Sequence, residues 1–145
     1  MPFFEGWKGK CIWQPFYYDG QCANYLRELN FRKVIHEPLD FFERVKDNKF
    51  MSKVDIIIDN PPYTSPETKE KVLRTLVETN KPFVMLLPIY TLNNTFLRDI
   101  MDMQLIQCII PKKVFIRKTG KEELPFKYLV WFCYKVGLEK DLYFI

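Results

Sequence analysis

The segment 54–58, Val-Asp-Ile-Ile-Ile, constrains the fold more than any other part of this chain. Valine and isoleucine are branched at Cβ, and such residues favour strands because they pack well on a pleated surface. A strand that is apolar on both faces is typical of the inside of a parallel sheet, where helices cover both sides. Pro61 and Pro62 end the strand, since proline cannot donate a hydrogen bond to a neighbouring strand. The segment therefore predicts a buried central strand of an α/β sheet.

Other segments alternate between strand and helix patterns and fit the same sheet. Strands are predicted over residues 10–14, 33–36, 83–87, 105–110 and 127–135, with a last apolar piece at 142–145. Helices are predicted over residues 21–30, from Ser65 and Pro66 onward, and from Asn93 or Asn94 to about Met103. This order predicts a mostly parallel sheet with antiparallel strands at its C-terminal end. The chain has 145 residues and no linker or repeat, so residues 1–145 are expected to form one domain.

The composition argues against several classes of protein. Four cysteines without a C-x-x-C pair, together with His36 as the single histidine, do not form a zinc-binding pattern. The longest apolar run, residues 82–90, is far shorter than the roughly 18 residues that a membrane helix needs. The first residues do not have the pattern of a signal peptide. We therefore expect an intracellular protein with free thiols, no metal site and no membrane partner.

Three predicted loops follow strands of the sheet, over residues 15–20, 36–42 and 59–63. The carboxyl ends of parallel strands meet at one edge, and ligands of α/β sheets bind beyond that edge. The sequence therefore predicts one ligand site to which all three loops contribute.

The loop Asn60-Pro61-Pro62-Tyr63 carries the clearest chemical pattern. Its two prolines stiffen the backbone and leave only carbonyl acceptors. Asn60 adds a side-chain carbonyl, and Tyr63 adds a flat ring suited to stacking on a base. The amino nitrogen of adenine or cytosine is a poor nucleophile, because its lone pair is delocalised into the ring. Acceptors for both of its hydrogens favour a pyramidal nitrogen that can attack a methyl sulfonium. The alternative is that the two prolines simply end a buried strand.

This loop, with the strand before it, resembles the (Asp or Asn)-Pro-Pro-(Tyr or Phe) motif of S-adenosylmethionine (SAM)-dependent amino methyltransferases. The motif serves DNA, RNA and release-factor glutamine methyltransferases, and the match is closest to compact, phage-type N6-adenine DNA methyltransferases. The resemblance extends more weakly over nearly the whole chain. It implies a Rossmann-like SAM-methyltransferase sandwich, SAM as the cofactor and adenine N6 of DNA as the substrate. Asn60 and Pro61 would accept hydrogen bonds from the amino group, beside Pro62, and Tyr63 would stack on the base.

The resemblance also implies where SAM binds. Asp40, Phe41 and Phe42 lie where the family holds the adenine of SAM. Asp40 fits equally well as the N-cap of a helix over residues 41–45, and the two roles are compatible. Glu37, near the end of a strand, is a candidate for the ribose hydroxyls, or simply a solvated side chain.

The family places a glycine-rich turn beside the methionine part of SAM, and residues 13–20 correspond to it here. Pro15 and Phe16 fit the compact relatives, Asp19 suits the ammonium group of the cofactor, and Gly20 suits a tight turn into a helix. The segment departs from the pattern, because it has one glycine and three aromatic rings. Packing of these rings over a helix end is the alternative. It would suit an inactive methyltransferase fold that acts as a binding module or partner subunit.

Basic residues crowd the predicted loop between residues 111 and 125. Lys112, Lys113, Arg117 and Lys118 lie there, in a chain of net charge +4. The cluster is a candidate for phosphate contacts, or a solvated loop between strands. We expect a nucleic-acid partner, DNA ahead of RNA, with the target base flipped or single-stranded. No segment is left for a target-recognition domain, so a partner subunit that supplies it is also expected.

Overall fold

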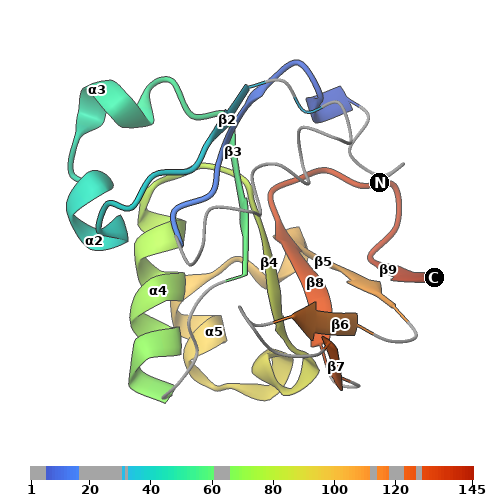
Figure 1. Cartoon of the computed structure of the whole chain (residues 1–145). Helices are drawn as coiled ribbons and strands as arrows, with labels where there is room; N and C mark the ends of the chain where they lie inside the picture. The colour runs from blue at the N-terminus through green and yellow to red at the C-terminus, as the bar shows by residue number, and fades with distance from the viewer. Residues whose placement is uncertain are drawn as a thin grey trace.

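The computed structural model describes residues 6–16, 31, 33–60, 66–111, 114–117, 123–126 and 129–145. Seven strands in this part of the chain form one sheet in the order β2-β1-β3-β4-β8-β5-β9 (Figure 1). The strands are β1 (Cys11–Trp13), β2 (Lys33–Ile35), β3 (Ile56–Asp59), β4 (Phe83–Pro88), β5 (Ile106–Ile110), β8 (Leu129–Tyr134) and β9 (Leu142–Phe144). The α/β class expected from the sequence is confirmed.

The order of the strands reverses direction at β1. The chain passes from β1 to β2 on one side of it, and returns to β3 on the other side, and all three strands are parallel. Such a reversal is a topological switch point, and in open α/β sheets it opens a crevice at the carboxyl ends of the two strands. β4 continues the parallel part next to β3. A ligand crevice is therefore expected between the carboxyl ends of β1 and β3.

The antiparallel strand expected near the C-terminus is β8. It lies inside the sheet, antiparallel to β4 on one side and to β5 on the other. β9 then pairs with β5 in parallel at the edge. β5 consequently runs in the same direction as β4, and its carboxyl end lies at the same edge of the sheet.

β3 is buried on both faces, as its β-branched sequence predicts. Ile57 packs on one face and Ile56 and Ile58 on the other, which follows the two-residue repeat of a strand. On the Ile57 side lies α4 (Pro66–Glu78), together with α5 (Phe96–Ile100) (Figure 1). The buried face of α4 carries Val72, Leu73 and Leu76, spaced as a helix packed on a sheet requires.

Two short helices follow β2 on the same face as α4. These are α2 (Phe41–Arg44) and α3 (Asn48–Met51), and α3 was not predicted from the sequence. Each begins with an aspartate, because Asp40 accepts from the backbone N–H of Glu43 and Asp47 accepts from that of Phe50. Among the described residues, no helix has the length and apolar character needed to cross a membrane.

The helix predicted from Asn93 or Asn94 to about Met103 is present, but it is shorter than predicted and has a different N-cap. Residues in this region form a 3-10 turn, η2 (Ile89–Asn93), then α5 with Thr95 at its N-cap, and a second 3-10 turn, η3 (Met103–Leu105). Met101 is extended, which ends α5. The side chain of Asp102 accepts from the N–H of Gln104 and starts the next turn. A local side-chain hydrogen bond of this kind competes with a continuous helix.

The predicted loop over residues 111–125 is wrong, because it contains two paired strands. β6 (Val114–Arg117) and β7 (Glu123–Phe126) form a separate antiparallel pair. Pro125 lies within β7, a position that a two-stranded ribbon tolerates because its outer edge needs no N–H donor. The predicted helix over residues 21–30 lies outside the described residues. The thiols of Cys11, Cys108 and Cys133 are free, as expected.

The packing of α4 on the sheet can be tested with Leu76→Ala. Leu76 is completely buried, so removing its side chain should lower the free energy of unfolding by about 2–5 kcal/mol. Urea unfolding followed by circular dichroism measures this. The matched control is Glu78→Ala at the exposed end of the same helix, for which we expect a change within about 0.5 kcal/mol. Equal losses in the free energy of unfolding for Leu76→Ala and Glu78→Ala would contradict the packing of α4 on the sheet.

Candidate functional site

Four parallel strands end at one edge of the sheet, and the chain segments that follow them form the candidate site. Residues 14–16 follow β1, residues 36–40 follow β2, Asn60 follows β3, and η2 follows β4. Gln14 connects the first two segments, because its carbonyl contacts the Nδ1 atom of His36 at 3.0 Å. The predicted convergence of three loops at the carboxyl edge therefore holds for their described residues.

Asp59, the last residue of β3, lies at the switch point between β1 and β3. Its Oδ2 atom accepts from the backbone N–H of Phe16 at 2.6 Å, and its Oδ1 atom accepts from the N–H of Asn60 at 2.8 Å. The residue is only 4% exposed. Burial raises the pKa of its carboxyl to about 7, although the two backbone N–H groups oppose the shift. Asp59 thus joins two loops that are 43 residues apart in the chain.

Asn60 is exposed directly beyond this buried carboxylate. Its backbone is fixed through the Asp59 contact, while its side chain remains accessible to a ligand. Pro61, Pro62 and Tyr63, the rest of the predicted catalytic loop, lie outside the described residues.

Aromatic rings join the segment after β1 to the segment after β2. The ring of Phe16 lies 5.0 Å from that of Phe41, and Phe41 lies 5.1 Å from Phe42. Phe41 is buried against Trp13 at 5.7 Å, whereas Phe16 and Phe42 are half-buried. The structure therefore brings three of the predicted cofactor residues together, with Phe41 in the core beneath the other two. Pro15 is buried beside them.

The two predicted acidic cofactor residues after β2 have structural partners. Asp40 is exposed and caps α2 through its Oδ2 atom, which confirms the capping alternative. Glu37 is exposed, and one of its carboxylate oxygens lies 3.7 Å from the guanidinium of Arg44. Asp19 and Gly20 lie outside the described residues.

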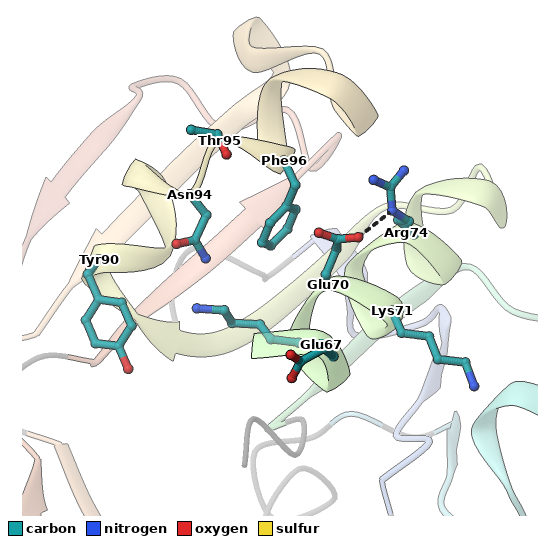
Figure 2. Close-up of a pocket in the computed structure, with 9 residues that line it drawn as sticks. Glu67, Glu70, Lys71, Arg74, Tyr90, Asn94, Thr95 and Phe96 are labelled. Atoms are coloured by element: carbon teal, nitrogen blue, oxygen red, sulfur yellow. Dashed lines mark hydrogen bonds and ion pairs between the residues drawn. The ribbon is translucent and has the colours of Figure 1, made fainter. Parts of the chain in front are cut away.

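An open groove of about 650 Å³ lies between α4 and the segment after β4. Figure 2 shows Tyr90, Asn94 and Phe96 on one side of it, and side chains of α4 on the other. Lys69 is 8% exposed, its ammonium lies 4.9 Å from the centre of the Tyr90 ring, and burial lowers its pKa. Lys71 lies over the ring of Phe42 at 4.2 Å, so α4 also contacts one of the predicted cofactor residues after β2.

Asp59 and Lys69 were not among the site residues predicted from the sequence, although a signal existed for each. Asp59 is a charged residue at the end of an otherwise apolar strand, and buried charges are costly unless they are hydrogen-bonded. Lys69 precedes Val72, Leu73 and Leu76 by three, four and seven positions, so it shares their buried helix face. In both cases, the signal is a charged residue at a position where the sequence pattern predicts burial.

β5, the strand that precedes the basic segment (residues 111–125), ends at the same edge of the sheet as Asn60. β5 ends at Ile110 on that edge, and β8 begins with Leu129 paired to Pro88, the last residue of β4. The β6–β7 pair lies between these two points in the chain, and Figure 1 shows it at this end of the sheet. Arg117 ends β6, while Lys112, Lys113 and Lys118 lie outside the described residues. No group of side chains in the described part of the chain is arranged to hold a metal ion.

No protein-family model matches the chain, and no curated protein matches it.

The buried carboxyl of Asp59 should make stability depend on pH. Its pKa is raised in the folded protein, so the folded state binds more protons than the unfolded state between about pH 4 and pH 7. The stabilising contribution of the protonated form is therefore present below about pH 4 and lost as the pH rises through about 7. Relative to Asp59→Asn, which stays neutral, the wild type should lose free energy of unfolding across this range. Denaturant unfolding of both proteins at several pH values measures the difference.

Asp55→Asn is a matched control for this measurement. Asp55 accepts a backbone hydrogen bond from Cys11 at 2.7 Å, at the other end of the β1–β3 pair, but it is exposed. Its replacement should not reproduce the pH-dependent difference. A stability difference between wild type and Asp59→Asn that stays constant from pH 4.5 to 8 would contradict the burial of an ionisable group at this position.

Proposed function

We propose that this chain is a SAM-dependent methyltransferase of exocyclic amino groups, with adenine N6 of DNA as its substrate. The observation that carries the proposal is the position of Asn60. This residue of the Asn-Pro-Pro-Tyr loop is exposed directly after a strand buried on both faces, beside the switch point of the sheet. A ligand crevice is expected at that point from topology alone.

The sheet supports the proposal through its C-terminal strands. The family resemblance implies a mostly parallel sheet with an antiparallel end, and β8 is reversed between β4 and β5. Only two short helices and no further described strand lie between β2 and β3, so the fold is compact at this point. This agrees with the resemblance to small enzymes of the family.

The residues at the ends of β1 and β2 are compatible with SAM. Phe16 and Phe42 are half-buried rings on a rigid aromatic base, and Asp40 keeps an exposed carboxylate beside them. Phe42 and Asp40 would hold the adenine, while Phe16, with Asp19 and Gly20, would surround the methionine end. The buried Oε1 atom of Gln14 has no hydrogen-bond partner among the described residues, which is uncommon for such an atom. When bound, SAM supplies an electrophilic methyl group.

Asn60 would act on the substrate amino group. Its side-chain carbonyl and the backbone carbonyl of Pro61 would each accept one amino hydrogen, which frees the nitrogen lone pair for attack. The Asp59 contact restrains the backbone N–H of Asn60, which would help to orient the acceptor before the substrate arrives. Tyr63 would stack on the base. A paired base is not reachable in this way, so the target base must be flipped or single-stranded.

The β6–β7 pair supports a nucleic-acid substrate. It extends from the edge of the sheet at which Asn60 lies, and its surroundings in the sequence are rich in lysine and arginine. Contacts from such residues to phosphates position a nucleic acid without reading its sequence. Target selection would then belong to a partner subunit.

The cofactor assignment predicts that SAM or its demethylated product stabilises the protein. Ligand at 100 times its dissociation constant should raise the free energy of unfolding by about 2.7 kcal/mol. Isothermal calorimetry and thermal unfolding measure the binding and the stabilisation. Phe42→Ala should weaken binding, whereas Phe144→Ala on the exposed edge strand should not. Absence of any effect at millimolar ligand would refute the cofactor assignment.

Asn60→Ala should reduce methyl transfer by about 10²–10³-fold, by analogy with the loss of one preorganised hydrogen-bonding group. The fold and SAM binding should persist, because the side chain is exposed. Transfer of a labelled methyl group to single-stranded and duplex oligonucleotides provides the measurement. Asn48→Ala, an exposed asparagine on α3, is the control and should keep full activity. Wild-type protein that binds SAM but methylates none of these substrates would instead favour a non-catalytic binding module.

A further inference from the structure

Two aspartates, one just before β3 and one at its end, accept hydrogen bonds from backbone N–H groups in and just after the neighbouring strand β1. Asp55, before β3, binds the N–H of Cys11 at 2.7 Å, and Asp59, at the end of β3, binds the N–H of Phe16 at 2.6 Å. The two contacts therefore tie β1 to β3 at opposite ends. The first contact is exposed, while Asp59 is almost completely buried.

The second oxygen of Asp59 distinguishes it from Asp55. It binds the N–H of Asn60, so a single carboxylate holds one residue of the predicted cofactor segment and one residue of the predicted catalytic loop. Phe16 is in turn packed against Phe41, which belongs to the segment after β2. A displacement of the carboxylate would therefore affect both Phe16, which follows β1, and Asn60, which follows β3.

We propose that Asp59 is a positioning residue that holds Phe16 and Asn60 at one fixed spacing, and that only its ionised form does so. The proposal rests on the proposed function, because it assigns Phe16 to the cofactor and Asn60 to the substrate. It adds a coupling between them: cofactor affinity and the orientation of Asn60 depend on the same carboxylate.

The chemistry of the carboxyl group explains this dependence. An ionised carboxylate offers two equivalent acceptor oxygens, one for each N–H. After protonation one oxygen carries a hydrogen and becomes a donor, so it is a poorer acceptor for the N–H that it faces. Protonation should therefore weaken one of the two contacts and loosen the spacing between the loops.

The surroundings of Asp59 make this change accessible near neutral pH. Burial raises the pKa of the carboxyl to about 7, and the N–H groups of Phe16 and Asn60 are what oppose it. In the sheet, Asp59 lies opposite Met85 of β4, and the side chain of Met85 is uncharged. The adjoining segment after β2 carries His36, Glu37 and Asp40, and none of these side chains is among the causes of the shift.

Nuclear magnetic resonance of the wild-type protein tests the contacts directly. The amide protons of Phe16 and Asn60 should titrate together, with a common midpoint near pH 7. In Asp55→Asn this titration should persist, and in Asp59→Asn it should vanish. If these amides do not titrate in the wild type, or titrate with different midpoints, the proposal is overturned. This test needs neither ligand nor activity.

Affinity for the demethylated product of SAM tests the coupling. If only the ionised form is competent, the apparent affinity should fall about tenfold from pH 8 to pH 6, in proportion to the ionised fraction. Asp55→Asn should show the same fall, which corrects for titration of the ligand itself. Asp59→Asn should bind weakly at both pH values. Equal affinity of the wild type at pH 6 and pH 8 would overturn the coupling.

The two hypotheses fail in distinguishable ways. A wild-type protein that binds no SAM product at any pH would refute the proposed function, while the amide titration would still decide whether Asp59 holds the two loops together. If Asp59→Asn does not fold, the wild-type and Asp55→Asn titrations remain sufficient for that decision.

Discussion

A carboxylate buried at the end of β3 is the interaction on which the carboxyl edge of the sheet depends. Removing a charge from water is costly, and a carboxylate persists there only if it is hydrogen-bonded. Asp59 receives two backbone N–H groups, one from Phe16 and one from Asn60. The same contacts that make its burial tolerable join the residue that follows β3 to the segment that follows β1. Burial nevertheless raises the pKa of the Asp59 carboxyl to about 7, so this group changes its protonation state near neutral pH.

The segments that follow β1 and β2 are anchored to the core by aromatic packing. Trp13 on β1 contacts Phe41 of α2 and Phe50 of α3, at 5.7 Å and 5.1 Å between ring centres. Helices of four residues are too short to be stable by themselves, so α2 and α3 depend on this packing and on their aspartate caps. The half-buried rings of Phe16 and Phe42 consequently pack against Phe41, which is buried in the core.

Segments with a strong local pattern were predictable from the sequence. β3 and β4 are continuous apolar runs, and α4 begins at Pro66 and has one apolar face, so their residues dictate both type and burial. The helix expected after Asn93 ends at Ile100, short of Met103, because Met101 is extended and Asp102 starts a separate turn. The β6–β7 pair was missed because its strands are short, and Pro125 made the segment resemble a loop. Of the candidate site, the exposure of Asn60 and the cap at Asp40 were within reach of the sequence.

The sequence by itself determined the α/β class, the buried central strand and the loop that follows it, because these depend on side chains that are neighbours in the chain. Only the tertiary structure decided that β8 lies between β4 and β5, that the β6–β7 pair shares an edge with Asn60, and that Asp59 reaches Phe16. Pairing between strands brings together residues that are far apart in sequence, and no local pattern specifies such a partner. The raised pKa of Asp59 has the same origin, since burial of a carboxyl group is a property of everything packed around it.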